Sequence, residues 1–306
     1  IRTERPTPPP FDPDCPFCPG NEDRTPPEIH RRPLEGPWQW RLIPNMYPAV
    51  AREGTTERHG QEMTLEMDAV GAHEVLIESP THSERLDEMD LDRLGSRVRL
   101  WRDRSREIAA EPWARAVSVF RNFGRKAGTS IEHPHSQIIA TPVTPPELRR
   151  RVDVAERYWD EYGRSVYADL LEGELDRGLR LVAVRDDFAA IAPFASRFPF
   201  ETWILPRDHT ASFTQLADGQ IPGLAGLLRD VLRGLRDAAG DPDLNLAIRS
   251  APVGDEGKRS YVWHLGIFPR LTIPAGFELG AGMAINPMPP ERAAERLRTC
   301  QAIAAG

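Results

Sequence analysis

The sequence predicts an α+β fold made of two tandem halves, with mainly antiparallel sheets and flanking helices. Three observations support this fold class. Short runs of β-branched and aromatic residues outnumber the amphipathic helical segments. Several of these runs follow one another directly, as hairpin strands do. The order of strands and helices in residues 1–160 also recurs in residues 161–306. A repeat of about 150 residues indicates tandem domains and not a solenoid.

The first half begins with a proline-rich stretch, residues 1–37, which we expect to form an extended arm held by contacts, without regular secondary structure. Strands are expected at residues 38–44, 73–79, 115–122 and 135–141. Residues 84–110 carry apolar side chains at helical spacing, and residues 146–162 begin with prolines that suit the first turn of a helix. Both segments are therefore predicted to be helices.

The second half repeats this order but lacks most of the reactive side chains. Its expected strands are residues 178–186, 188–194, 200–206, 244–250 and 261–269, and its expected helix is residues 221–239. Aligning the halves sets Ser165 and Ala168 against Cys15 and Cys18, and His264 and Gly266 against His133 and His135. We therefore expect the chemistry to reside in the first half.

Composition and charge narrow the class of protein. The chain has 306 residues, 40% of them hydrophobic and 28% charged, which is ordinary for a globular protein. Its net charge of −7 argues against broad binding to nucleic acid or to a membrane surface. It contains no apolar run long enough for a membrane span and no segment that resembles a signal peptide. We expect a cytoplasmic enzyme or binding protein.

The chain has only three cysteines, and two of them form the motif Cys15-Pro-Phe-Cys18. Two thiolates at this spacing can hold one side of a tetrahedral zinc ion, but two further ligands are then needed. With no second motif of this kind, histidines must supply them. His82 and His133 are the preferred candidates, and His73 is an alternative. The alternative without a metal is that the two cysteines are simply buried or redox-active.

The segment GTSIEHPHSQIIA, residues 128–140, places two histidines one residue apart after a glycine-containing loop. Such a loop exposes backbone N–H groups that suit phosphate oxygens. A neutral imidazole beside a phosphate is a competent nucleophile, so His135 can form a covalent bond to phosphorus, and Gln137 can donate a hydrogen bond to a phosphoryl oxygen. The alternative is a pair of buried histidines with a purely structural role.

These residues carry a family resemblance. Residues 122–140, NFGRKAGTSIEHPHSQIIA, resemble the signature of galactose-1-phosphate uridylyltransferases, which are part of the histidine-triad superfamily. Further motifs of this chain resemble other parts of the family pattern, in the same order along the sequence. CPFCPG resembles the family's zinc cysteines, LIPNMYPAV resembles its nucleoside-contacting strand, ESPTHS resembles the segment with its third zinc ligand, and AGFELGAGMAINPMPPERAAERLR resembles its sugar-binding region. The resemblance thus extends over nearly the whole chain.

The resemblance implies specific roles for residues of this chain. His135 would be the nucleophile and Gln137 the group that stabilises the nucleotidylated histidine. Contacts to the nucleotide and the sugar would come from Asn45, Asn122, Gly128, Ser130 and Glu278. The structural zinc ion would be held by Cys15, Cys18, His82 and His133. The family also implies a homodimer and ping-pong transfer of a nucleoside monophosphate from a nucleotide sugar to a sugar 1-phosphate.

Two departures from the family pattern affect the expected substrate and metals. Met46 stands where many uridylyltransferases have an acidic residue, and GAHEV and NMYPAV resemble the branch that includes ADP-glucose phosphorylases. Phosphorolysis by inorganic phosphate is therefore the alternative to transfer onto a sugar 1-phosphate. Gly266 replaces one histidine of the family's iron site, so no iron is expected. A third possibility is a zinc-stabilised nucleotide-binding protein without catalysis.

Overall fold

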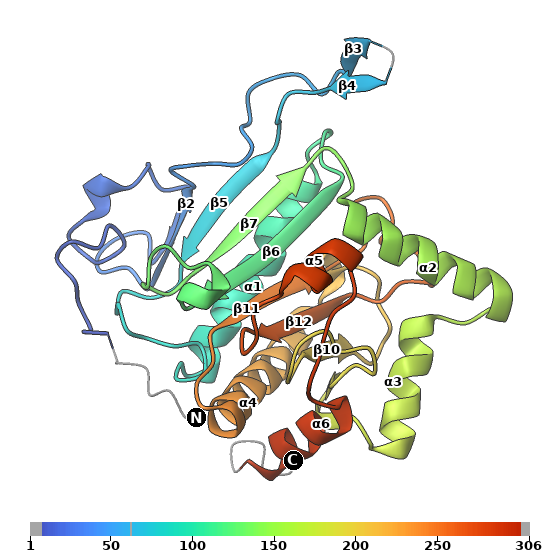
Figure 1. The fold of residues 1–306 in the computed structure, drawn as a ribbon. Helices are drawn as coiled ribbons and strands as arrows, with labels where there is room; N and C mark the ends of the chain where they lie inside the picture. Colours follow the sequence, from blue (N-terminus) through green and yellow to red (C-terminus); the bar gives the residue numbers. More distant parts are fainter. Residues whose placement is uncertain (1–7, 62, 301–306) are drawn as a thin grey trace.

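The computed structural model describes residues 8–61 and 63–300 and contains one large sheet (Figure 1). The strands of its first half are β1 (His30–Arg32), β2 (Trp40–Pro44), β5 (Ala72–Ile77), β6 (Ala116–Phe123) and β7 (His135–Thr141). Those of the second half are β8 (Leu181–Arg185), β9 (Phe188–Ile191), β10 (Thr202–Pro206), β11 (Leu244–Arg249) and β12 (His264–Pro269). A separate hairpin is formed by β3 (His59–Gln61) and β4 (Thr64–Glu66).

The helices are α1 (Leu91–Ala109), α2 (Pro146–Tyr162), α3 (Val166–Arg177), α4 (Ile221–Ala239), α5 (Gly276–Ala281) and α6 (Pro290–Thr299). Short 3₁₀ turns are η1 (Glu22–Arg24), η2 (Arg125–Ala127), η3 (Phe213–Gln215) and η4 (Asp218–Gln220). The content of antiparallel strands and helices confirms the predicted α+β class. None of the helices in the described part of the chain is both long and apolar enough to cross a bilayer.

The two halves share a single sheet and do not form two separate ones. The strand order is β1-β2-β5-β7-β6-β11-β12-β10-β9-β8, and each neighbouring pair is antiparallel. The pairing of β6 with β11 joins the halves, so that β5-β7-β6 on one side mirrors β10-β12-β11 on the other. The central strands are thereby paired on both edges, which protects them from the aggregation that exposed edges invite.

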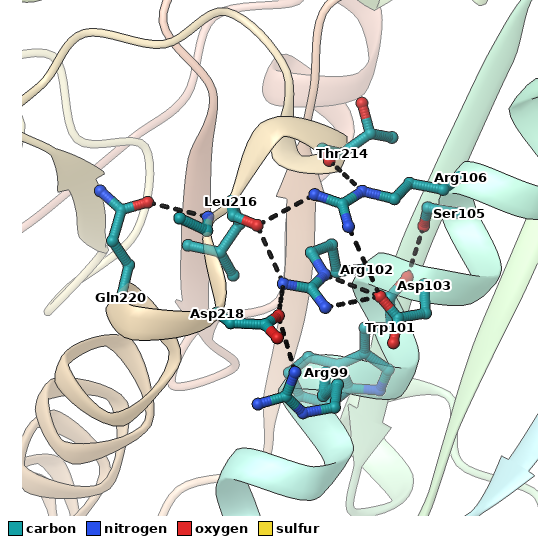
Figure 2. A network of polar contacts seen from close by, with 11 residues as sticks. Arg99, Trp101, Arg102, Asp103, Ser105, Arg106, Thr214, Leu216, Asp218 and Gln220 are labelled. Atoms are coloured by element: carbon teal, nitrogen blue, oxygen red, sulfur yellow. Dashed lines mark hydrogen bonds and ion pairs between the residues drawn. The ribbon is translucent and has the colours of Figure 1, made fainter.

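One face of the sheet is covered by α1 and α4, and their apolar side chains form the main core with α6. A polar network strengthens this packing between the halves (Figure 2). The buried side chain of Arg102, on α1, donates from Nη1 to the carbonyl of Leu216 at 3.0 Å and pairs with Asp218. Arg106 donates to the same carbonyl at 3.1 Å. Both guanidinium groups come from α1 in the first half, so they hold the turn before α4, which is in the second half, against α1.

The expected helix at residues 84–110 begins later than predicted, at Leu91. Asp90 is its N-cap, since the carboxylate of Asp90 accepts a hydrogen bond from the backbone N–H of Arg93 at 2.8 Å. Residues before this cap turn irregularly, yet Leu86 and Met89 remain buried in the main core. The apolar pattern thus identified the buried residues correctly but not the start of the helix.

The described residues of the proline-rich arm pack on the sheet, as expected. The expectation that the arm has no regular structure is wrong, because it contains η1 and β1, and β1 pairs with β2 at the edge of the sheet. Phe17 and the two cysteines form a small core with Trp38, Ile43 of β2, and Val75 and Ile77 of β5. Val75 and Ile77 lie opposite Gln137 and His135 of β7 in the register. Residues directly opposite each other on neighbouring strands have side chains on the same face of the sheet, and so do residues two apart on one strand. The arm therefore covers the face on which the side chains of His135 and Gln137 lie.

Candidate active site and metal centre

The structure brings the four predicted metal ligands together. Their ligand atoms, from Cys15, Cys18, His82 and His133, all lie within 4.8 Å of one another, and all four residues are buried. Cys18 Sγ lies 3.5 Å from His82 Nδ1 and 3.6 Å from His133 Nδ1. A tetrahedral zinc ion with ordinary bond lengths sets its sulfur and nitrogen ligands about 3.5 Å apart. The observed spacing therefore fits a zinc ion.

The surroundings of this cluster also suit a metal. His133 Nε2 lies 2.7 Å from the carbonyl oxygen of Ser79, so Nε2 carries the proton and donates it there, which leaves Nδ1 as a lone pair facing the cysteines. Burial lowers the pKa of His133 to about 4, and it raises the pKa of the Cys15 thiol to about 11. A dication would offset the cost of a buried thiolate. The cluster thus has the donor chemistry of a structural Cys2His2 site.

The alternative prediction, that His73 is one of the metal ligands, is wrong. Its two ring nitrogens are used elsewhere: Nδ1 accepts from the backbone N–H of Ala49 at 3.0 Å, and Nε2 lies 2.7 Å from Gln137 Oε1. His73 also does not belong to the Cys15–His133 cluster. The physical reason is its position near the start of β5, whereas His82 follows the strand and reaches the arm through the contact of its backbone with Pro10.

His135 is the first residue of β7 and is buried at 6% exposure. Its Nδ1 lies 2.8 Å from the carbonyl oxygen of His133. A carbonyl can only accept, so Nδ1 carries the proton and Nε2 keeps its lone pair. Burial is the main cause that lowers the pKa of His135, and Arg121 adds to it. The ring is therefore neutral and has one nitrogen available for nucleophilic attack.

A cavity of about 570 Å³ opens beside His135, which is large enough for a nucleotide sugar. Among its lining residues are Asn122, Gly124 and Thr129 of the glycine-containing loop. Gly124 and Gly128 have φ values of 86° and 85°, which favour glycine and bend this loop around η2. The predicted residues Gly128 and Ser130 are in the same loop but are exposed and do not line the cavity.

Asn122 is oriented by a residue that the sequence analysis missed. Asn245 of β11 lies opposite Asn122 in the register, and its Nδ2 donates to Asn122 Oδ1 and to the carbonyl of Ala127, both at 2.8 Å. The Nδ2 group of Asn122 is then the part of its amide that can donate to a ligand. Asn245 lies 123 residues further along the chain, and only its place on β11, opposite Asn122, could have indicated this contact.

Glu278 lies apart from this cavity in the single chain. It is at the start of α5, and its carboxylate accepts from the backbone N–H groups of Ala275 and Ile285, at 2.9 Å each. These two hydrogen bonds lower the pKa of Glu278. The side chain therefore stabilises its own helix and the following loop, and it does not line the cavity beside His135.

The second half contains a buried histidine at the position that corresponds to His135. His264 is the first residue of β12, and its Nδ1 lies 3.3 Å from the carbonyl of Val262, the same local arrangement as His135 with His133. His264 therefore resembles His135 and not His133, with which the sequence alignment had paired it. It is fully buried and stacks on Trp203 with ring centroids 4.6 Å apart. Such a ring has no access to a substrate.

Comparison with known proteins identifies the relatives of this chain. The family models for the N-terminal and C-terminal domains of galactose-1-phosphate uridyl transferase match residues 2–145 and 151–304. ADP-glucose phosphorylase of Arabidopsis thaliana is 36% identical over 289 residues, covering 93% of this chain and 81% of the relative. Galactose-1-phosphate uridylyltransferase of Thermotoga maritima is 26% identical over 297 residues, covering 93% and 89%.

A solved structure shares the fold. The crystal structure of an ADP-glucose phosphorylase from Arabidopsis thaliana with bound ADP-glucose superimposes with a TM-score of 0.86 at 34% sequence identity, covering 97% of this chain and 92% of that one. Because both family models together match most of the sequence, and because the fold matches over nearly its full length, this chain belongs to the galactose-1-phosphate uridylyltransferase family.

Proposed function

We propose that this protein is a nucleotidyltransferase that takes a nucleoside monophosphate from a nucleotide sugar onto His135 and passes it to a phosphate acceptor. The observation that carries this proposal is the lone pair on His135 Nε2, which the hydrogen bond from Nδ1–H to the His133 carbonyl leaves available beside the cavity. A buried neutral imidazole in this tautomer is suited to attack on phosphorus.

The reaction proceeds in two displacements. In the first, His135 Nε2 forms a bond to the α-phosphorus, the bond from that phosphorus to the bridging oxygen breaks, and the sugar 1-phosphate leaves with the electron pair. In the second, an oxygen of the acceptor phosphate attacks the same phosphorus, and the bond to Nε2 breaks and returns the lone pair to His135. The carbonyl of His133 accepts from Nδ1–H throughout and stabilises the positive charge that the ring gains.

Zinc is proposed as the metal of the Cys2His2 cluster, where it would serve to fix the arm and not to react. The residues of this chain supply the link to the active site. Phe17, between the two cysteines, makes edge contacts to the rings of His133 and His135, with centroids 6.0 and 5.5 Å apart. A metal that anchors Cys15 and Cys18 therefore also holds the ring that packs against the nucleophile.

ADP-glucose and inorganic phosphate are the proposed donor and acceptor. The support is the 36% identity with an ADP-glucose phosphorylase and the fold similarity to such an enzyme with bound ADP-glucose. The second candidate is transfer of uridine monophosphate to a hexose 1-phosphate, which the family models and the Thermotoga maritima relative favour. The two differ in the base of the donor and in the acceptor.

A direct test incubates the protein with ADP-glucose or UDP-glucose, weighs it for a covalent adduct, and then adds phosphate or galactose 1-phosphate. We expect an adenosine monophosphate adduct from ADP-glucose, and its discharge by phosphate to give ADP. A uridine monophosphate adduct discharged only by galactose 1-phosphate would favour the second candidate. No adduct from any of several nucleotide sugars would overturn nucleotidyl transfer and favour a non-catalytic binding protein.

We also propose a homodimer in which Glu278 contacts the hexose bound to the partner subunit. The support is the exposed apolar surface around it: Phe277, Leu279 and Ile285 have exposures of 58%, 77% and 55%. Sedimentation velocity should give a dimer, and Leu279→Asp should yield a monomer with reduced transfer. A wild-type protein that is monomeric and fully active would contradict this arrangement.

A further inference from the structure

Gln137 is held by two neighbours on the sheet. Its Oε1 lies 2.7 Å from His73 Nε2, on β5, and 3.4 Å from Asn45 Nδ2, just after β2. Asn45 is itself fixed, since its Oδ1 accepts from the backbone N–H of Tyr47 at 2.8 Å. From the sequence, Asn45 was expected to contact the nucleoside and His73 was only an alternative metal ligand, so neither was expected to contact this amide.

The backbone determines which nitrogen of His73 carries the proton. The N–H of Ala49 points at Nδ1, at 3.0 Å, and a backbone N–H can only donate. Nδ1 is therefore unprotonated, and in the neutral ring the proton resides on Nε2. That proton points to Gln137 Oε1. Asn45 Nδ2 and His73 Nε2 lie 3.0 Å apart because both donate to the same acceptor, Gln137 Oε1.

These hydrogen bonds fix the orientation of the Gln137 side-chain amide. With Oε1 accepting from His73 and Asn45, the Nε2 amino group is the end that remains to donate. Gln137 and His135 lie two residues apart on β7 and so share a face of the sheet. A phosphoryl group on His135 Nε2 would therefore meet an N–H donor. The reversed amide would present a lone pair to an anionic oxygen, which is repulsive.

We propose that His73 is a positioning residue that holds the amide of Gln137 with its amino group toward the phosphoryl group during transfer. The proposal rests on the proposed function and deepens it. His73 touches neither the phosphoryl group nor the nucleophile in this scheme. Its effect passes through Gln137, so removing it should slow the transfer step without weakening the binding of the nucleotide sugar.

The experiment measures the single-turnover rate of adduct formation with the donor that loads the wild-type protein. His73→Met keeps the volume and removes the donor, whereas His73→Gln keeps an N–H that can reach Oε1 and is the matched control. We expect His73→Met to slow transfer about 10- to 100-fold, because one donor to the phosphoryl group is misdirected. His73→Gln should recover most of the rate, and the KM should change little in either variant.

A double-mutant cycle separates positioning from general damage. In a Gln137→Ala background we expect His73→Met to have no more than about a 2-fold further effect, since the residue through which it acts is gone. An equal slowing in both backgrounds, an unchanged rate in His73→Met, or a raised KM at an unchanged rate would each overturn the proposal. Failure of the wild type itself to form an adduct would instead contradict the proposed function.

Discussion

Replacing His135 by alanine is expected to abolish the covalent adduct and to reduce turnover by at least about 10⁴-fold. In the proposed mechanism the lone pair of His135 Nε2 forms the bond to phosphorus, and neither Gln137 nor Asn122 can replace it. Steady-state rates with the donor and acceptor that serve the wild type, together with the intact mass after incubation with donor, measure the effect.

The matched control is His59→Ala, since His59 lies on the β3–β4 hairpin with its side chain 60% exposed, outside the cavity. We expect this variant to keep the wild-type rate. The metal content and the thermal unfolding of the His135 variant should also match the wild type, because His135 is not in the metal cluster. Turnover by the His135 variant at or near the wild-type rate would contradict the proposed mechanism.

The second large effect concerns the metal centre. Cys18 is fully buried and lies within 3.6 Å of two histidine nitrogens, so Cys18→Ala should abolish metal binding and release the arm. Structural zinc sites contribute large folding free energies, and we expect a loss of about 5 kcal/mol or more and a lower melting temperature. Metal analysis and calorimetry measure both quantities.

Cys300→Ala is the control for this variant. Cys300 is partly exposed, donates to the carbonyl of Arg296 and packs at the edge of the main core, outside the metal cluster. Its replacement should leave the metal content unchanged and lower the melting temperature far less than Cys18→Ala does. If Cys18→Ala retained a full equivalent of metal and the wild-type melting temperature, the Cys2His2 assignment would be wrong. A chelator that leaves the wild-type stability unchanged would lead to the same conclusion.

Much of the site could be predicted because its motifs are local in sequence. The segment around His133 and His135 contains the proposed ligand in a loop and the proposed nucleophile at the start of the strand that follows it. The Cys15–Cys18 pair is recognised from its own spacing. The structure also places His82 beside the two cysteines and His133, as the sequence analysis expected. In each case a few neighbouring residues indicate the chemistry, and the fold only has to bring these short segments together.

The rest depended on long-range packing, which a single sequence does not reveal. Asn245 orients Asn122 only because β6 pairs with β11, and His73 reaches Gln137 only because β5 pairs with β7 in one register. The helix α3 was missed although Ser165 and Gly178 flank it with suitable capping positions. Likewise, two tandem halves were expected, but their fusion into one sheet follows from tertiary pairing.

The most direct test of the central claim is to locate the nucleotide on the loaded protein. Wild-type protein incubated with the loading nucleotide sugar would be digested without acid, because a phosphorus–nitrogen bond is acid-labile, and its peptides sequenced by mass spectrometry. We predict a nucleoside monophosphate on His135 and none on His133. A nucleotide on His133 or on any other residue, or a protein that turns over without ever carrying one, would contradict the division of roles between the two histidines.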